Sequence, residues 1–100
     1  LSREDFQRHW SEVHAPLVTS LADALGIVSY KQIHALASEG NADPVFDGFA
    51  HVVFGSMEAF KAMLTTTAGR SAARILWDDE KQFLDRSRSS IVWGAEHSII

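Results

Sequence analysis

Hydrophobic positions recur every three or four residues through the first quarter of the chain, which is the spacing of one face of an α-helix. Ser2 stands where an N-cap residue is favoured, Glu4 and Asp5 follow in the first turn, and Gly26 supplies a stop. The pattern predicts a helix between Ser2 and Gly26 with His14 on its buried face. The residues on that face are Phe6, Trp10, Val13, His14, Leu17, Leu21 and Leu25.

A second histidine and a proline complicate this helix. His9 precedes His14 by five residues, about 500° around an α-helix and so roughly 140° away from it. His9 is therefore expected to face solvent or a partner, and the two histidines are not expected to chelate one metal ion. Pro16 has no N–H, so it leaves a carbonyl unpaired one turn earlier and is expected to bend the helix near His14. The bend either widens the space beneath His14 or only wraps the helix around a sheet.

After Gly26, hydrophobic and polar residues alternate with a period of two instead of following the helical spacing. Residues 27–36, IVSYKQIHAL, and 48–55, GFAHVVFG, alternate and are rich in β-branched and aromatic side chains, which predicts two strands. The intervening residues 37–48 carry the Gly, Asn, Asp and Pro of a loop.

Two helical segments and a last strand are predicted in the remaining half. Ser56 caps a helix that weakens at residues 65–69, and residues 71–77 predict a further helical segment. The acidic run at residues 78–80 is interpreted as a solvated turn, and Phe83 with Leu84 offers a short anchor after it. Residues 89–100 predict a final strand.

The predicted order is helix, strand, strand, helix, helix, strand, in a single domain over residues 1–100. This is an α+β arrangement that matches a ferredoxin-like βαββαβ sandwich without its opening strand. In that topology the first strand lies between the last and the third, so Val92 or Trp93 would lose neighbours on one side. We expect the missing strand to come from about ten upstream residues or from another chain. A three-stranded sheet is the alternative.

Charge and composition exclude some partners. The net charge is −4, and the nine Lys and Arg residues are spread singly, so no basic stripe is available for nucleic acid or for an anionic membrane surface. Cysteine is absent, which excludes disulfides, thiolate metal sites and a cysteine nucleophile. No apolar run reaches the roughly 20 residues of a membrane span, and the first residues do not resemble a signal peptide. A cytoplasmic location is the default expectation.

Several short motifs, taken in order, resemble EthD-type domains of the dimeric α+β barrel superfamily. The first is the run F...W..VHAPLV, formed by Phe6, Trp10, Val13, His14, Ala15, Pro16, Leu17 and Val18. Next come Tyr30 with Gln32 and His34, FDG at residues 46–48, SMEAF at 56–60, the element Asp79, Phe83 and Asp85, and AEH at 95–97.

The resemblance implies a homodimer in which two sheets pack face to face, with a cavity between each sheet and the first helix. Its superfamily includes polyketide cyclases, small monooxygenases that need no metal or flavin, haem-degrading enzymes, isomerases and dehydratases, so fold alone decides no chemistry. No cofactor is expected. The family's first strand and the basic turn before the helix are missing here, which puts in question any pocket wall that they form.

His14 is the main candidate for catalysis. A histidine on an apolar helix face is more often a core residue, but in relatives a histidine at this point faces the cavity. An imidazole titrates near neutral pH and suits proton abstraction from the acidic carbon between two carbonyls. Tyr30 is the second candidate, since its phenol can hydrogen-bond a developing enolate oxygen. Tyr30 and Gln32 can equally belong to the dimer interface.

The predicted substrate-binding residues are Trp10, Gln32, His34 and His97. Tyr30, Gln32 and His34 alternate onto one strand face, and burying them unpaired would cost about 1–3 kcal/mol each. That face is therefore a cavity wall, a hydrogen-bonded network or solvent-exposed. His51 and His97 approach these residues only in some strand registers. No metal site is predicted, because no compact signature such as HExxH is present.

Two hypotheses follow. The first is a small cofactor-independent enzyme, a cyclase, isomerase, dehydratase or oxygenase, acting on an aromatic or polyketide-like molecule. The second is a non-catalytic dimeric barrel that binds a small hydrophobic molecule or serves as an accessory protein of an oxidative degradation system. The several polar groups around one predicted pocket favour the first.

Overall fold

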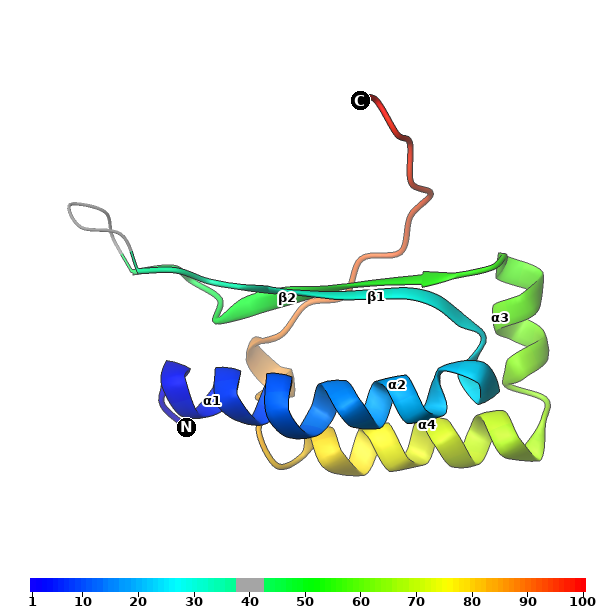
Figure 1. The fold of residues 1–100 in the computed structure, drawn as a ribbon, viewed down its shortest axis with the longest axis horizontal. Coiled ribbons are helices and arrows are strands. Elements are labelled where there is room, and N and C mark those ends of the chain that lie inside the picture. The colour runs from blue at the N-terminus through cyan, green and yellow to red at the C-terminus, as the bar shows by residue number, and fades with distance from the viewer. Residues whose placement is uncertain (38–42) are drawn as a thin grey trace.

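The computed structural model describes residues 1–37 and 43–100 and shows a layer of helices beneath a small antiparallel sheet (Figure 1). Residues 38–42 of the predicted loop lie outside the described residues. Helix, strand, strand, helix and helix follow one another in the predicted order. The elements are α1 (Arg3–His9), the π-helical turn η1 (Trp10–His14), α2 (Ala15–Leu25), β1 (Ile27–His34), β2 (Gly48–Phe54), α3 (Met57–Met63), α4 (Thr67–Glu80) and the 3₁₀ turn η2 (Arg86–Arg88).

The first predicted helix is confirmed at both ends. The Ser2 hydroxyl accepts a hydrogen bond from the Asp5 N–H at 3.1 Å, and Gly26 ends α2 in the left-handed conformation with φ of 71°. Between them the disturbance expected from Pro16 takes the form of a widened turn. The Ala15 N–H donates to the Trp10 carbonyl, five residues back, while Pro16 has no N–H to donate one turn back.

The two strands pair in one register, and this register decides which side chains face the helices. Tyr30 lies opposite Val52, Gln32 opposite Ala50 and His34 opposite Gly48. These pairs form the inner face, because Gln32 bonds to the backbone of η1 and the His34 ring stacks on Trp10. The outer face carries the pairs Ser29 with Val53, Lys31 with His51 and Ile33 with Phe49.

Two polar side chains of α1 fix the helix to the far ends of the strands. The Gln7 amide donates to the carbonyls of Ala35 and Asp47, at 3.0 and 2.9 Å, where the two strands separate. The Arg3 guanidinium pairs with the Asp47 carboxylate at 3.0 Å. These contacts join α1 to both strands and set its height above the inner face.

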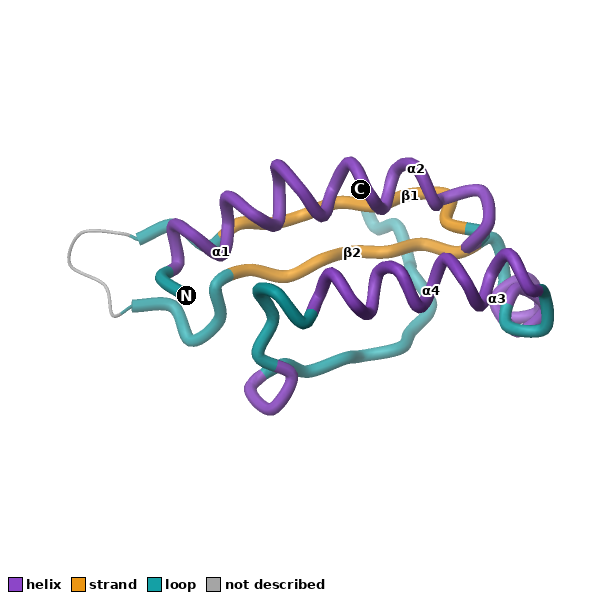
Figure 2. The backbone as a smooth tube through the Cα atoms, turned by 90° about the horizontal axis from the view of Figure 1, so that it is seen from below, coloured by secondary structure: helices purple, strands orange, loops and turns teal. Residues whose placement is uncertain are grey.

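The helices meet in a small core at the other end of the sheet. Leu25, Met63 and Ala72 are its buried members, contributed by α2, α3 and α4. Seen from below, β1 runs along α1 and α2, and β2 runs between these helices and α4 (Figure 2). The Thr66 hydroxyl caps α4 by accepting from the Gly69 N–H at 2.9 Å, so this helix is longer than predicted. None of the helices in the described ranges has both the length and the apolarity needed to cross a bilayer.

The predicted strand over residues 89–100 is wrong. This segment forms no strand, leaves the helical layer and crosses to the other side of the sheet (Figure 1). Val92 is 90% exposed and Trp93 60% exposed. A strand needs a neighbour for its backbone N–H and C=O groups, and in the ferredoxin-like order the last strand pairs with the opening one. No opening strand is present among residues 1–37 and 43–100, and their sheet has two strands rather than three.

Candidate active site

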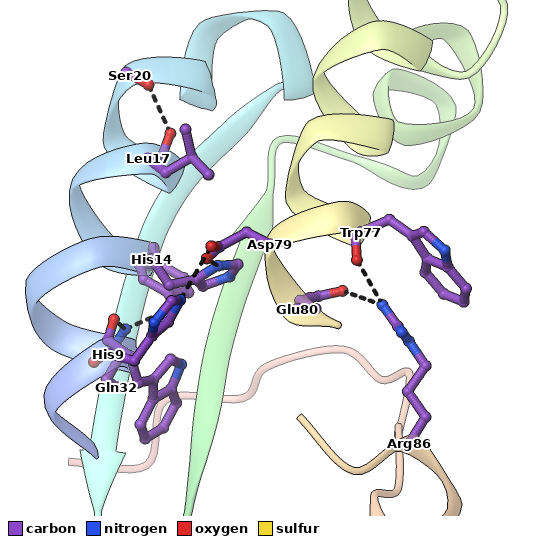
Figure 3. A network of polar contacts seen from close by, with 11 residues as sticks. His9, His14, Leu17, Ser20, Gln32, Trp77, Asp79, Glu80 and Arg86 are labelled. Carbon is purple, nitrogen blue, oxygen red and sulfur yellow. Dashed lines mark hydrogen bonds and ion pairs between the residues drawn. The ribbon is translucent and has the colours of Figure 1, made fainter. Parts of the chain in front are cut away.

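Two histidines of the first helix converge on one carboxylate of α4. The Asp79 Oδ2 atom lies 2.7 Å from Nδ1 of His14, and its Oδ1 atom lies 3.0 Å from Nε2 of His9. Figure 3 shows both imidazoles pointing toward Asp79 from the opposite helix. An ionised carboxylate only accepts hydrogen bonds, so each of these nitrogens carries the proton.

This arrangement corrects two predictions. His9 does not face solvent or a partner, because its side chain is only 26% exposed and is bonded to Asp79. Nor is the acidic run at residues 78–80 simply a solvated turn, since Asp79 is 14% exposed and lies on the inner side of α4. The reason for the first error is the turn η1: an i→i+5 hydrogen bond winds the chain less tightly than an α-helix, so residues five apart come onto the same side.

Phe83 packs against both imidazoles and closes the cluster from below. Its ring centroid lies 4.8 Å from that of His9, 5.0 Å from that of His14 and 5.3 Å from that of Phe6. Phe83 is 8% exposed, which confirms its predicted role as an anchor. Its apolar ring keeps water away from one side of the polar contacts and strengthens them.

Electrostatics at Asp79 follow from these neighbours. Burial alone would raise the pKa of Asp79, but the hydrogen bonds and the charges of His14 and His9 outweigh burial, so the pKa lies below the ordinary value. The carboxylate is therefore ionised at neutral pH and able to accept from both rings.

His14 is buried, with 5% of its surface exposed, and its ring borders the main cavity. Since Nδ1 donates to Asp79, Nε2 of the neutral ring carries a lone pair. Nε2 has no hydrogen-bond partner among residues 1–37 and 43–100. The contact between Nδ1 and the Asp79 carboxylate resembles the aspartate–histidine pair of a hydrolase, in which the carboxylate fixes the tautomer and the orientation of the imidazole.

The predicted polar strand face is a hydrogen-bonded network built around Gln32. Its amide nitrogen donates to the Trp10 carbonyl at 2.8 Å and to the Tyr30 hydroxyl at 2.9 Å. Its amide oxygen accepts from Nε2 of His34 at 2.8 Å. The His34 ring stacks on the Trp10 indole, with 4.7 Å between the ring centroids. All hydrogen-bonding atoms of the Gln32 side chain thus have partners.

Tyr30 ends this network at the cavity. Its oxygen accepts from Gln32, so its own proton is available to a ligand. Burial raises the pKa of the phenol, as does the charge of Glu80, while hydrogen bonds with Gln32 and Trp10 act in the opposite direction. The pKa of Tyr30 is therefore above its ordinary value near 10, and the side chain is a neutral donor at physiological pH.

The main cavity has a volume of about 1220 Å³ and is lined by the helices, by both strands and by the C-terminal segment, including Ile33 and Phe49 of the outer sheet face and Ile91, Val92 and Trp93. This exceeds the roughly 300–1,000 Å³ of closed ligand pockets, and the cavity is partly open to solvent. Most of its lining is apolar. Its apolar lining residues include Val18, Leu25, Ile27, Val52, Phe54, Phe60 and Leu76, and His14 and Tyr30 add polar groups to the lining.

Five of the predicted site residues come together. His14 and Tyr30 line the cavity, and Trp10 is buried at 6% exposure. Gln32 bonds to Tyr30 and to His34, whose ring stacks on Trp10. His97 does not join them. It lies exposed in the unpaired C-terminal segment, because no strand forms there to hold it. Among the described residues no group of three ionisable side chains is arranged to hold a metal ion.

The contribution of Asp79 to the candidate site was missed at the sequence level. The signal that identifies it is the spacing of Ala72, Leu76, Asp79 and Phe83, which continues the buried face of α4 by steps of three and four. An acidic residue in that series must find a partner in the interior. His9 gave no such signal, since its position depends on the π-helical turn.

Comparison with known families agrees with this geometry. No solved structure matches the chain. The EthD domain family matches residues 1–87, which include both histidines, Tyr30 and Asp79, and stops before the unpaired C-terminal segment. The chain is therefore a member of the EthD domain family, with an α+β, ferredoxin-like fold from which the opening strand is missing.

Proposed function

We propose that this chain is the subunit of a small enzyme that abstracts a proton from an activated carbon of an aromatic or polyketide-like molecule, using only its own side chains. Cyclisation, isomerisation, dehydration and oxygenation of such molecules can all begin with this step. The observation that carries the proposal is His14, whose Nδ1 is held by Asp79 at 2.7 Å while its ring borders the cavity shared with Tyr30.

In the proposed step, the lone pair of His14 Nε2 takes the proton from a carbon between two carbonyl groups. The C–H bond breaks and its electron pair becomes the π-bond of an enolate, whose negative charge lies on a carbonyl oxygen. The Tyr30 hydroxyl donates to that oxygen, and the Asp79 carboxylate balances the charge of the imidazolium. The proton then returns from His14 to the product or to water.

Deuterium exchange tests this step without knowledge of the natural substrate. An aryl 1,3-diketone such as 1-phenylbutane-1,3-dione is incubated in D₂O with the protein, and loss of the proton at its central carbon is followed by NMR. We expect exchange above the buffer rate for the wild type, a fall of about 10²-fold or more for His14→Gln, and a smaller fall for Tyr30→Phe. His97→Gln is the matched control, since this exposed histidine lies outside the site. Equal rates for His14→Gln and wild type would refute the proposal.

The apolar lining of the cavity supports a second candidate, binding of a small hydrophobic molecule without turnover, as in an accessory protein of an oxidative degradation system. On this alternative the diketone binds, but its exchange rate stays at the buffer value. His14→Gln would then change affinity no more than an apolar substitution elsewhere in the lining, such as Val18→Ala.

We further infer that the chain forms a homodimer through the outer face of the sheet, with residues 1–100 as one domain. Two large apolar side chains of this face support this: Phe49 is 63% exposed and Ile33 is 39% exposed. An exposed apolar face of this kind on a sheet is typical of a protein–protein interface. In the dimeric barrel the equivalent face of the partner would cover it.

A further inference from the structure

We propose that His9 is a positioning residue of the site: it holds the second oxygen of Asp79 and thereby fixes the carboxylate that orients His14. The inference rests on the proposed function only for the role of His14 as a base. The contacts themselves can be tested without any substrate.

A single hydrogen bond would leave the Asp79 carboxylate poorly defined. The last torsion of an aspartate side chain is broad and roughly two-fold, so the group can rotate while it keeps one partner. In this site the two oxygens have different partners, Oδ2 with His14 at 2.7 Å and Oδ1 with His9 at 3.0 Å. Two donors on opposite oxygens fix the plane of the carboxylate, and with it the direction of the His14 ring.

The widened turn is what allows the second contact. His9 and His14 are five residues apart, and the bond from the Ala15 N–H to the Trp10 carbonyl closes a turn of five residues, Trp10–His14, that begins directly after His9. Pro16 suits this turn, because it has no N–H to complete an α-helical bond and its ring would clash with a carbonyl four residues back. Single π-helical turns within α-helices occur frequently at functional sites.

A packing role is the competing explanation for His9. Its ring lies 4.8 Å from that of Phe83, and its side chain is 26% exposed, so it contributes to the apolar cluster as well. The two roles are separated by His9→Phe, which keeps an aromatic ring beside Phe83 but has no N–H. His9→Gln does the reverse, since it loses the ring and keeps an amide donor.

The first experiment is imidazole NMR of the ¹⁵N-labelled protein, read at His14. For His9→Phe we expect the His14 Nδ1 proton to exchange with water at least tenfold faster than in wild type, and for His9→Gln a rate closer to wild type. Arg8→Gln is the control, because Arg8 is exposed and its guanidinium pairs with Asp5, away from the cluster around Asp79. Unchanged exchange in His9→Phe overturns the proposal.

A second variant tests the turn without removing a group from the site. Deletion of the exposed Glu12 together with Pro16→Ala converts the turn into an ordinary α-helix, in which His9 and His14 stand four residues apart and again on one side. We expect exchange at the His14 Nδ1 proton within about twofold of wild type. Exchange as fast as in His9→Phe would show that the turn does not act by aligning the two histidines.

These outcomes are distinguishable from failure of the proposed function. If the wild type does not exchange the diketone proton but His9→Phe still loosens the His14 Nδ1 proton, His9 positions Asp79 in a protein that is not this kind of enzyme. If both effects are present, His9→Phe is expected to lower kcat for diketone exchange by about tenfold with KM little changed, because His9 is not among the residues that line the cavity.

Discussion

Replacement of Asp79 by asparagine is the sharpest test of the cluster, because it removes one proton acceptor and changes the shape of the side chain very little. Hydrogen bonds to a charged group contribute about 1.5–3 kcal/mol each. Asparagine keeps one oxygen for one imidazole, but its NH₂ group then faces the N–H of the other. With Asp79 only 14% exposed, water relieves little of this conflict. We expect the free energy of unfolding to fall by about 2 kcal/mol, which lowers Tm by about 8–16 °C for a domain of this size.

Urea denaturation at pH 7, followed by tryptophan fluorescence, measures this loss. The adjacent Asp78→Asn is a matched control. The Asp78 side chain is 54% exposed and pairs with Arg74 at 3.2 Å and Lys81 at 3.4 Å, so its loss should cost under about 1 kcal/mol. If the two variants differ from each other by less than about 0.5 kcal/mol, the reasoning about the buried carboxylate is wrong.

Three further predictions follow from other contacts. Because the pKa of Asp79 is lowered in the folded protein, its contribution to stability is present above about pH 4 and is lost as the pH falls through the folded pKa. Urea titrations should show that the difference in unfolding free energy between wild type and Asp79→Asn at pH 5 shrinks below pH 4. A difference that persists unchanged to pH 2 would contradict this. Gly48→Ala should cost about 1–3 kcal/mol, because its Cβ would meet the Ile33 carbonyl and lie 2.7 Å from the Trp10 ring, whereas Gly55→Ala, with open space around the new Cβ, should be close to neutral in the same assay. Phe49→Glu should convert a dimer into a folded monomer in sedimentation analysis, and a monomeric wild type would end the dimer proposal.

The local elements were predictable because each depends on a few neighbouring residues. Ser2, Ser56 and Gly26 mark helix ends through their own hydrogen bonds or backbone angles, and these were all confirmed. The two strands were equally clear from alternation. The predictions that were wrong concerned features that depend on contacts between distant segments of the chain.

Two residues, His9 and Trp93, show why sequence patterns alone did not predict the whole structure. His9 was placed on the wrong side because a period of 3.6 was applied across a turn that has five residues, and Pro16 indicated only that some disturbance would occur there. Trp93 was assigned to a strand from its pattern alone, yet a strand exists only with a hydrogen-bonded neighbour, and residues 1–37 and 43–100 provide none for it. The candidate site was predicted in part, through His14 and Tyr30, whereas Asp79 required the packing of α4 against the first helix.

The hydrogen bonds around Gln32 have a fixed donor-to-acceptor direction, which is determined by the amide nitrogen of Gln32. Because the amide gives its protons to Tyr30 and to the backbone, the phenol proton remains for whatever occupies the cavity. Gln32→Glu replaces that nitrogen by oxygen and preserves nearly every atom position, but a carboxylate cannot donate. The phenol would then have to turn its proton toward residue 32, and the cavity would present an acceptor where it had presented a donor. A ligand with a carbonyl group should bind wild type more tightly than Gln32→Glu, and a ligand with a hydroxyl group should discriminate between them much less.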